Sequence, residues 1–549
     1  MTTHRRRTRN MRRRLGIVAV LAAAALVLSG CSLSSSTPTG GSSTTVKNGP
    51  TVLRVLAGSE VADMVPILKT AEKAIGVDVE LSYIGTIDGT EDVASGSTKG
   101  KFDATWFPNN RYLALLPGAE TATSTSVKIM SSPVVFGLRS DIAHSLGWDT
   151  KPPTWAQIAQ AAAAGKFTYG MTNPAASNSG FSALVSVATA LSGTGSALTT
   201  ANITSVEPQL TSFFSGQKLT AGSSGFLATK FTADPTSVDG IINYESVLLG
   251  LKPKGEQLTI IRPTDGVVTA DYPLTLLSSA AASKRALFTK LTNWLTTPKI
   301  QEEIVQQTHR RPAVPGVPTG EIFPSTVLFE TPFPNQVDVV NSLISVYLNQ
   351  VRAPAQTVFL LDTSGSMDGT RLGELQKALK NLAGADTSTS GTFAEFRDRE
   401  RVTLIPFNTE PGAATTVEVG DTSATQNAAF KTIKAFTNGL EADGNTSIYS
   451  SLKKAYKIAV GDVKDRPNTF VSVVLMTDGE NNSGISANQF QTYYKSLGAT
   501  GKAIPAYVVL FGDGDTKALT SIANLTGGQI FDARNGDLTA AFQAIRGYQ

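Results

Sequence analysis

Three oxygen-bearing side chains follow an apolar run in the second half of the chain. Residues 358–369 read VFLLDTSGSMDG, in which Asp362, Ser364 and Ser366 stand at alternate positions. Hard oxygen donors of this kind suit Mg²⁺, with Mn²⁺ and Ca²⁺ as alternatives. Asp, Ser and Gly also favour turns for local reasons, so this stretch alone indicates either a turn or a metal site.

Two further segments favour the metal site. Residues 470–482 read FVSVVLMTDGENN and repeat the pattern of an apolar strand that ends in an acid, Asp478. Residues 443–459 read DGNTSIYSSLKKAYKIA and place Thr446 at the start of a helix. A parallel α/β sheet carries its ligand sites at the carboxyl ends of its strands. We therefore expect one metal site built from Asp362, Ser364, Ser366, Thr446 and Asp478.

This set of residues resembles the metal-ion-dependent adhesion site of von Willebrand factor type A (VWA) domains. That site reads D-x-S-x-S, followed by a distant Thr and a further Asp, and all five positions match here. The resemblance covers about residues 355–549 and implies a doubly wound, Rossmann-like α/β fold. It also implies that Ser364, Ser366 and Thr446 hold Mg²⁺, and that Asp362 and Asp478 bind it directly or through water. A sixth position would stay open for a carboxylate.

The predicted site is suited to recognition rather than to catalysis. Two acids and three uncharged hydroxyls give a divalent ion only two anionic ligands, so an Asp or Glu of a partner protein would be attracted to its open position. Catalysis would also need a general base, and the three His residues of the chain, His4, His144 and His309, all lie outside residues 355–549. We expect that the protein is not an enzyme. A metal-dependent hydrolase is the less favoured alternative.

An EF-hand is excluded at this position. In a calcium-binding loop that began at Asp362, the sixth residue would be Gly and the twelfth would be Glu. The chain has Met367 and Gly373 at these positions.

The first half of the chain has a different organisation. Residues 51–315 alternate short apolar runs with helical patterns, which predicts an α/β domain with mainly parallel sheets. A Pro-rich stretch over residues 309–320 indicates a boundary, and residues 337–351 predict one connecting helix. We therefore assign residues 316–354 to a connector.

The order of segments in residues 51–315 resembles bacterial solute-binding proteins of ABC importers, with their two-lobed periplasmic-binding-protein fold. The resemblance rests on VLAGSE, FDATWFPN and PAASNSG, which begin at residues 55, 102 and 174. It implies that the chain crosses between two lobes near residues 132–139 and 259–272, and that the lobes close over a small solute. The candidate ligand-binding residues are Ser59, Asn109, Ser177, Ser179 and Tyr244. The serines could instead cap helices, and Tyr244 could belong to the core.

The N-terminus predicts export. Seven Arg residues within the first fourteen positions are followed by an apolar run over residues 15–28 and by LSGC, which ends at Cys31. This resembles the signal peptide and lipobox of bacterial lipoproteins, which implies removal of residues 1–30 and acylation of Cys31. Residues 31–50 would form a Ser/Thr/Gly tether on the outer face of the cell membrane. An ordinary signal peptide is the alternative, and translation could begin at Met1 or Met11.

The net charge and the cysteine content limit the partners and the covalent links that we expect. Without residues 1–30 the chain has 41 basic and 44 acidic residues, so its charge gives no reason to expect nucleic acid as a partner. Cys31 is the only Cys, so no disulfide can form within the chain. We expect a membrane-anchored binding protein in which residues 355–549 dock a protein carboxylate and residues 51–315 hold a ligand. The alternative is a receptor that delivers solute to an ABC permease, with the VWA domain as an accessory dock.

Overall fold

The structure is a computed structural model that describes residues 49–251, 257–324, 327–512, 514–534 and 538–548. The expectations for the signal peptide, for acylated Cys31 and for most of the tether concern residues outside these ranges. Among the described helices, none combines the length and the apolar composition needed to cross a bilayer.

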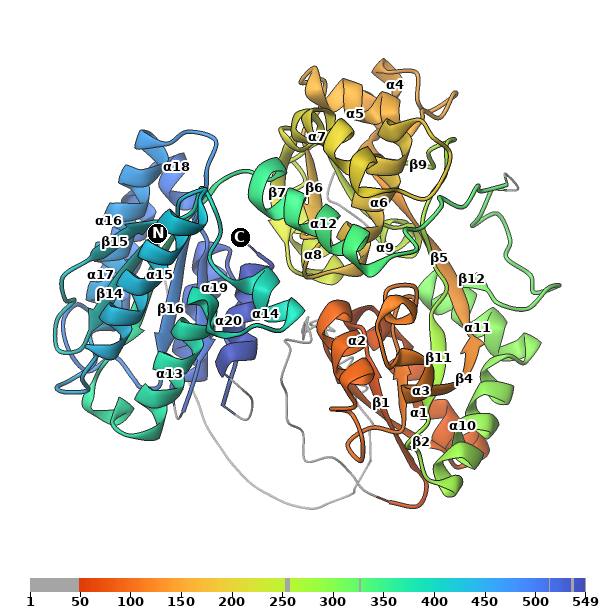
Figure 1. Ribbon diagram of the computed structural model, residues 1–549, viewed down its shortest axis with the longest axis horizontal. Coiled ribbons are helices and arrows are strands. Elements are labelled where there is room, and N and C mark those ends of the chain that lie inside the picture. Colours follow the sequence, from red (N-terminus) through yellow and green to blue (C-terminus); the bar gives the residue numbers. More distant parts are fainter. Residues whose placement is uncertain (1–48, 252–256, 325–326, 513, 535–537, 549) are drawn as a thin grey trace, which may run out of the picture. The chain divides into compact units, whose positions relative to one another are not determined.

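The first lobe of the N-terminal region is built on a five-stranded sheet (Figure 1). Its strands lie in the order β2 (Asp78–Tyr83), β1 (Val52–Ala57), β3 (Ala104–Trp106), β11 (Pro273–Leu277) and β4 (Thr123–Lys128). β1 pairs in parallel with β2 and β3, whereas β11 is antiparallel to β3 and β4. Its helices are α1 (Val65–Ile75), α2 (Thr86–Ser95), α3 (Ala119–Ala122), α10 (Ala282–Leu295) and α11 (Pro298–Thr308).

The second lobe is built on a seven-stranded sheet. Its main path is β10 (Thr269–Ala270), β5 (Met130–Arg139), β8 (Gly240–Tyr244), β6 (Tyr169–Thr172) and β7 (Gln217–Ala221), and β9 (Leu258–Ile261) and β12 (Arg311–Pro312) also pair with β5. Its helices are α4 (Ser140–Ser145), α5 (Trp155–Ala163), α6 (Asn178–Ser192), α7 (Thr200–Phe214), α8 (Ser224–Ala233) and α9 (Glu245–Gly250). Thr154 caps α5, since its side chain accepts a hydrogen bond from the Gln157 N–H.

The chain passes repeatedly between the two lobes. It first crosses between β4 and β5 and returns between β10 and β11, close to the crossings that the sequence predicts. After α11 it comes back to β5 at β12, where Arg311 pairs with Ser131 and Pro312 with Met130. The junction of the lobes is thus formed by three segments that are distant in the sequence.

The connector reaches the C-terminal domain through α12 (Val337–Val346) and a following π-helical turn (Tyr347–Val351). α12 buries Val340, Leu343 and Ile344, and Tyr347 stacks edge-on against Phe214 of α7. The connecting helix expected over residues 337–351 is therefore present, with its last turn widened.

The C-terminal domain has a six-stranded sheet (Figure 1). Its strands lie in the order β15 (Thr415–Glu418), β14 (Arg401–Phe407), β13 (Ala355–Asp362), β16 (Phe470–Thr477), β17 (Ala506–Leu510) and β18 (Ile530–Asp532), and β15 alone is antiparallel to its neighbour. The helices are α13 (Thr370–Lys380), α14 (Thr389–Ala394), α15 (Ser423–Asn438), α16 (Ile448–Asp465), α17 (Ala487–Ser496), α18 (Ala499–Lys502), α19 (Thr516–Thr526) and α20 (Leu538–Arg546).

This sheet is covered on both faces. Val358 and Leu360 of β13 lie in one apolar cluster with Leu452 of α16, whereas Phe359 and Leu361 lie in another with helices that include α13 and α20. All four side chains are fully buried. A strand buried on both sides has no polar face, which explains why VFLL is an unbroken apolar run.

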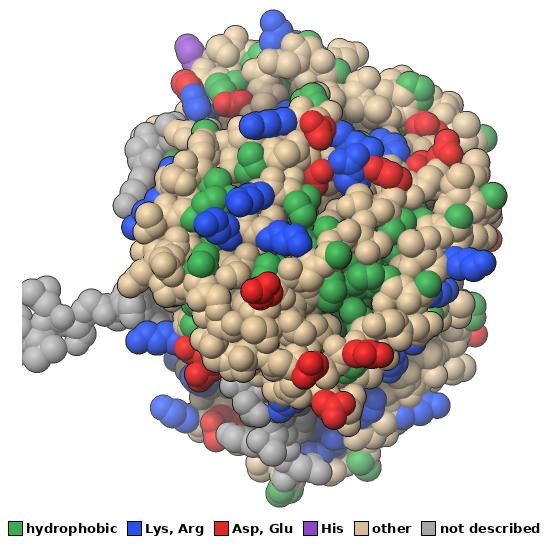
Figure 2. Space-filling model, turned by 90° about the vertical axis from the view of Figure 1, so that its left-hand side faces the viewer, with side chains coloured by type: hydrophobic (Ala, Val, Ile, Leu, Met, Phe, Trp, Pro, Cys, Tyr) green, Lys and Arg blue, Asp and Glu red, His purple; other side chains and the backbone are tan. Residues whose placement is uncertain are grey.

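Charged side chains of both signs are interspersed over the face that Figure 2 displays. This arrangement agrees with the near balance of acids and bases in the sequence after residue 30.

Candidate functional site

The candidate metal site lies at the carboxyl ends of β13 and β16. These two central strands pair in parallel, with Leu361 opposite Met476, so Asp362 and Asp478 leave the sheet at the same edge. Asp362 is fully buried and Asp478 is 2% exposed. Asp362 accepts hydrogen bonds from the Ser364 N–H at 2.8 Å and from the Thr477 hydroxyl at 2.5 Å.

The three hydroxyl groups lie at the same edge. Ser364 Oγ is 3.1 Å from Ser366 Oγ, and the Ser366 hydroxyl donates to Asp478 Oδ1 at 2.8 Å. A Cβ atom placed on Gly479 would lie 3.5 Å from Thr446 Oγ1 and 3.8 Å from Ser366 Oγ. Thr446 and Ser366 therefore approach one point from different loops, and the five residues predicted from the sequence are brought together.

Backbone hydrogen bonds hold these loops in place. The Gly365 N–H donates to the Gly444 carbonyl, and the Asp443 N–H donates to the Thr363 carbonyl, so the loop after β13 is fastened to the loop before α16. The Thr446 N–H donates to Asn482 Oδ1 at 2.7 Å, which fastens that second loop to the segment after β16.

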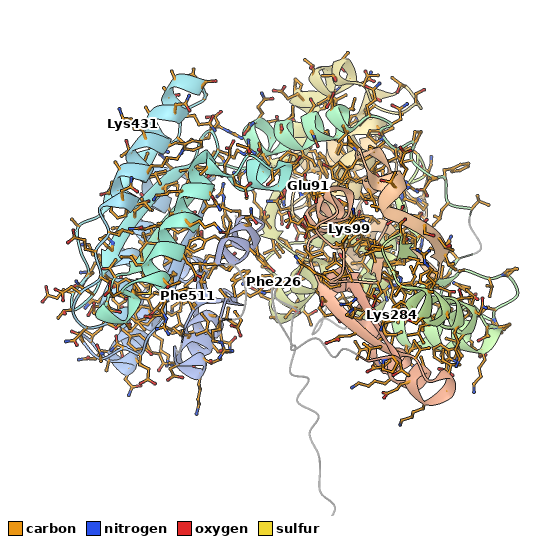
Figure 3. The ribbon with its side chains drawn as sticks, turned by 60° about the horizontal axis from the view of Figure 1, so that its bottom comes forward. Glu91, Lys99, Phe226, Lys284, Lys431 and Phe511 are labelled. Carbon is orange, nitrogen blue, oxygen red and sulfur yellow. The ribbon has the colours of Figure 1, made fainter. Side chains whose placement is uncertain are left out.

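The neighbouring strand β17 holds the third loop of the site, which follows β16. The N–H of Phe511, labelled in Figure 3, donates to the Thr477 carbonyl oxygen at 3.2 Å. The end of β16, which carries Asp478, is thereby fixed to the end of β17. The site is held by the fold itself, not only by the side chains that form it.

The electrostatics of the site favour a cation. Burial raises the pKa of Asp362 to about 6, because the carboxylate loses contact with water, and the charge of Asp478 raises it further. Hydrogen bonds from Thr477 and Ser364 act in the opposite direction. Asp478 also accepts a hydrogen bond from Arg371 of α13, whose Nη1 lies 2.7 Å from Asp478 Oδ2. No pattern in the sequence identifies Arg371.

The donor chemistry fits a hard divalent cation. Two carboxylates and three hydroxyls provide only oxygen ligands, which Mg²⁺, Mn²⁺ and Ca²⁺ prefer. Within the described residues there is no group of three or more His, Cys, Asp or Glu side chains that could hold a metal. A metal site in this part of the chain would therefore depend on the Ser and Thr hydroxyls.

Two of the predicted solute-binding residues meet at the junction of the lobes. Asn109 follows β3 of the first lobe, and its Nδ2 donates to Asn178 Oδ1 of the second lobe at 2.8 Å. Asn178 Nδ2 in turn donates to the Tyr244 hydroxyl at 3.0 Å. All three residues are at most 3% exposed. Asn178 is adjacent to the predicted Ser177 and Ser179, but the sequence does not reveal its role because its partners lie far along the chain.

The other predicted residues have different surroundings. Ser177 is the N-cap residue of α6, although its side chain makes no capping hydrogen bond. The Ser179 hydroxyl lies 2.8 Å from both the Thr172 and the Ser224 hydroxyls, within a buried network of the second lobe. Ser59 begins a short 3₁₀ helix after β1 and is partly exposed. The structure does not bring Ser177 and Ser179 into hydrogen-bonding contact with Asn109 or Ser59.

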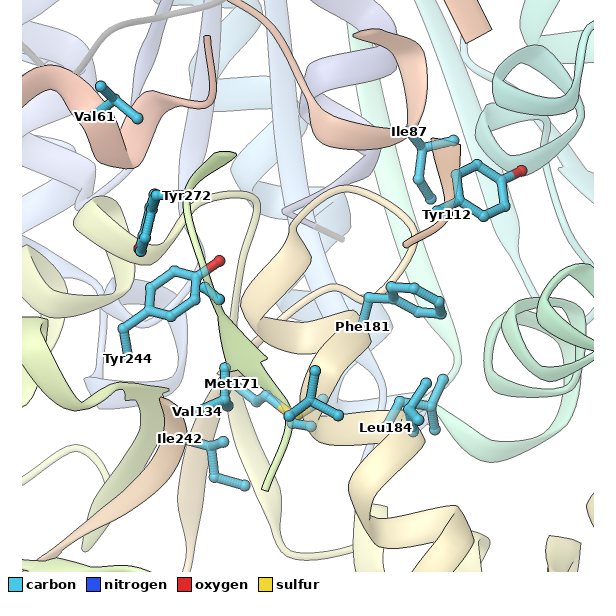
Figure 4. Packing of buried hydrophobic residues seen from close by; sticks show 14 of the residues in the cluster. Val61, Ile87, Tyr112, Val134, Met171, Phe181, Leu184, Ile242, Tyr244 and Tyr272 are labelled. Atoms are coloured by element: carbon cyan, nitrogen blue, oxygen red, sulfur yellow. The ribbon is translucent and has the colours of Figure 1, made fainter. Parts of the chain in front are cut away.

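A buried arginine completes the junction of the lobes. Arg310 is 1% exposed, donates to Asp63 Oδ2 at 2.5 Å and to the Glu60 carbonyl at 2.7 Å, and lies 4.6 Å from the centre of the Tyr272 ring. Tyr272 lies beside Tyr244, with 6.1 Å between the ring centres (Figure 4). A buried guanidinium is tolerated only when it is paired. Arg310 lies within the Pro-rich stretch of residues 309–320, so the sequence gives no sign that its side chain is buried and paired.

Solved structures resemble the two regions separately. One is a von Willebrand factor type A protein from Catenulispora acidiphila, with 20% identity, a TM-score of 0.28, and coverage of 36% of this chain and 43% of that one. Another is the periplasmic binding protein AfuA from Actinobacillus pleuropneumoniae, described with fructose-6-phosphate bound, with 13% identity, a TM-score of 0.43, and coverage of 55% and 98%. A third is IdiA (FutA) of Trichodesmium in complex with iron and citrate, with 12% identity, a TM-score of 0.41, and coverage of 54% and 98%.

Sequence comparisons match the two regions to separate family models. No curated protein matches the chain. Residues 53–308 match the model of the bacterial extracellular solute-binding proteins, and residues 357–544 match the model of the von Willebrand factor type A domain. The chain therefore combines a region of the bacterial extracellular solute-binding protein family with a C-terminal VWA domain.

Proposed function

We propose that this protein is a non-enzymatic, extracytoplasmic binding protein whose VWA domain uses a divalent cation to dock a carboxylate of a partner protein. The observation that carries the proposal is the gathering of Asp362, Ser364, Ser366, Thr446 and Asp478 at one edge of a parallel sheet. These side chains would hold the ion, with Mg²⁺ as the first candidate. When bound, the ion supplies a Lewis-acidic position for an Asp or Glu side chain.

The test uses the mature chain, residues 31–549, as bait for partners. We expect a partner to be retained in Mg²⁺ and released in EDTA, and Asp362→Ala to abolish retention in Mg²⁺. Asp465→Ala, which changes an exposed acid at the far end of α16, the helix that begins just after Thr446, is the matched control. Equal retention in Mg²⁺ and in chelator would contradict the proposal.

The solute-binding region supports a second function, delivery of a small polar solute to an ABC permease. The supporting observation is that Asn109 and Tyr244, both predicted as ligand residues, are joined through Asn178 across the junction of the lobes. Thermal unfolding of the full chain with sugar phosphates, ferric citrate and thiamin tests this function. A stabilisation by one solute that is lost in Tyr244→Phe would support it, whereas the absence of any shift with all three would count against it for these solutes.

Attachment to the outer face of the cell membrane through acylated Cys31 is part of the same proposal. The supporting features are the basic and apolar segments before Cys31 and the Ser/Thr/Gly tether after it. Cys31→Ser should shift the protein from the membrane fraction to the medium. Retention of this variant in the membrane fraction would contradict lipid anchoring.

A further inference from the structure

An arginine is built into the candidate metal site. Arg371 Nη1 lies 2.7 Å from Asp478 Oδ2, while Asp478 Oδ1 accepts the Ser366 hydroxyl. The Asp478 side chain is fully buried, whereas a third of the Arg371 side chain is exposed. Each oxygen of this carboxylate therefore has its own partner, so Arg371 does not occupy the side of Asp478 that faces the other predicted ligands.

The surrounding backbone is shaped around this guanidinium. A Cβ atom on Gly512 would lie 2.9 Å from Arg371 Cζ, 3.1 Å from its Nε and 3.0 Å from Asp478 Cβ. Gly512 also has φ of +59°, a conformation that other residues rarely adopt. The loop after β17 thus packs directly against the Arg371–Asp478 pair.

The position of Arg371 at the start of a helix is electrostatically unfavourable. It is the second residue of α13, where the positive end of the helix dipole disfavours a cation. The pair with Asp478 offsets this repulsion. The presence of an arginine at position 371 is therefore better explained by its contact with Asp478 of the candidate metal site than by a contribution to the stability of α13.

Formal charges indicate what Arg371 does to a bound ion. Asp362 and Asp478 contribute two negative charges, and Arg371 returns one positive charge. With a divalent ion added, the ligand set and Arg371 together carry one net positive charge, whereas without Arg371 they would be neutral. A nearby positive charge repels the metal ion and attracts a carboxylate, most strongly in a site that is shielded from water.

We propose that Arg371 couples the two binding events, because its charge weakens binding of the divalent cation alone and strengthens binding of the cation together with a carboxylate. The inference rests on the proposed metal-dependent docking function and specifies its regulation. The VWA domain would remain largely without metal until an acidic partner arrives, and cation and partner would then bind cooperatively.

Calorimetric titration of the mature chain with Mg²⁺, with and without acetate as the carboxylate probe, tests the coupling. In the wild type, acetate should tighten Mg²⁺ binding clearly. In Arg371→Gln, Mg²⁺ alone should bind on the order of tenfold more tightly, and the effect of acetate should shrink. Arg371→Lys keeps the charge and should retain most of the coupling.

A matched control separates a local effect from a change in overall charge. Arg401→Gln removes an arginine from the opposite end of the sheet, about 20 Å along the strands from the carboxyl edge. It should leave both Mg²⁺ titrations unchanged. Circular dichroism of each variant confirms that it is folded.

The outcomes distinguish the two proposals. If wild type and Arg371→Gln bind Mg²⁺ with equal affinity and equal response to acetate, Arg371 has no coupling role, although the docking function stands. If Arg371→Gln binds Mg²⁺ and the wild type does so only with acetate, both proposals are supported. If neither protein binds Mg²⁺ under either condition, the metal-dependent function itself is wrong, and the inference falls with it.

Discussion

The ionisation of Asp362 opposes folding in the absence of a metal. Its pKa of about 6 lies above the ordinary value of 3.8, because burial disfavours the carboxylate. The folded protein therefore binds this proton more tightly than the unfolded chain does. The penalty is full above pH 6, diminishes as the pH falls and disappears below about pH 4, with a magnitude of about 3 kcal/mol at neutral pH.

Asp362→Asn should therefore stabilise the protein in EDTA at pH 7.5, by up to about 3 kcal/mol. The gain over the wild type should shrink as the pH is lowered to 4.5. Chemical unfolding in EDTA at several pH values measures this difference. A variant that is less stable than the wild type at pH 7.5 would show that the hydrogen bonds from Ser364 and Thr477 outweigh the cost of burial.

Asn178 provides the second residue-level prediction. Replacement by Ala removes the partner of the buried Asn109 amide and of the Tyr244 hydroxyl, so Asn178→Ala should destabilise the solute-binding region by about 1–3 kcal/mol. Thermal unfolding measures the change. Asn293→Ala, at an exposed position of α10, is the control and should have little effect. Equal stability of both variants would indicate that water replaces the lost hydrogen bonds without cost.

The sequence predicts the positions of some site residues but not of others. The five predicted metal ligands stand next to strand ends and a helix start, so local pattern is enough to place them at one edge of a sheet. Arg371 lies in an ordinary amphipathic helix, and its relation to Asp478, 107 positions away, exists only in three dimensions. The same holds for Asn178 and Tyr244, which are 66 positions apart. The role of Tyr244 as a ligand residue stays a prediction.

At the level of the elements, the loop after β17 is the support on which the metal site rests. Gly512→Ala would combine the strain of φ near +59° with a clash against Arg371 and Asp478. The expected loss in stability is about 2–4 kcal/mol, most of it from the clash. Mg²⁺ affinity should also change, because the Arg371–Asp478 pair must move.

The contribution of strain can be isolated with a second glycine. Gly193 has a similar φ of +63°, but a Cβ at this position meets nothing within 4 Å. Gly193→Ala should therefore cost only about 1 kcal/mol and leave Mg²⁺ binding unaltered. Equal effects of the two substitutions on stability would mean that the loop after β17 moves at little cost in free energy and so relieves the clash.

The elements themselves follow from the sequence to different degrees. β13 and β16 are central strands buried on both faces, so continuous apolar runs predict them. β12 has two residues, one of them Pro312, and carries no periodic pattern. Its pairing with β5 depends on the arrangement of the two lobes, which is why the Pro-rich stretch predicts a boundary and not a third segment at the junction.

For the molecule as a whole, one buried acid joins the connector to the C-terminal domain. Glu400 accepts hydrogen bonds from Arg546 of α20 at 2.7 and 2.8 Å and from Arg352 at the end of the connector. Burial alone would raise the pKa of Glu400, but the two guanidinium groups outweigh this effect and lower it. Glu400 is thus ionised and provides one negative charge to two arginines that are at most 7% exposed.

Glu400→Gln should therefore destabilise the VWA domain by about 3–5 kcal/mol, because it removes the ionised carboxylate that both buried guanidinium groups contact. A loss of this size should lower the midpoint of unfolding by about 10 °C. Calorimetry of the full chain should resolve two transitions, since the solute-binding region and the VWA domain have separate sheets. The substitution should lower the transition that Mg²⁺ raises.

Glu374→Gln, at an exposed position of α13, removes the same charge and should leave both transitions in place. If Glu400→Gln instead lowers the transition that does not respond to Mg²⁺, the connector stabilises the solute-binding region more than the VWA domain. If both transitions fall together, the two regions unfold as one unit, and Arg352 transmits the loss from one to the other. Partner docking and solute binding would then be expected to influence one another through the connector.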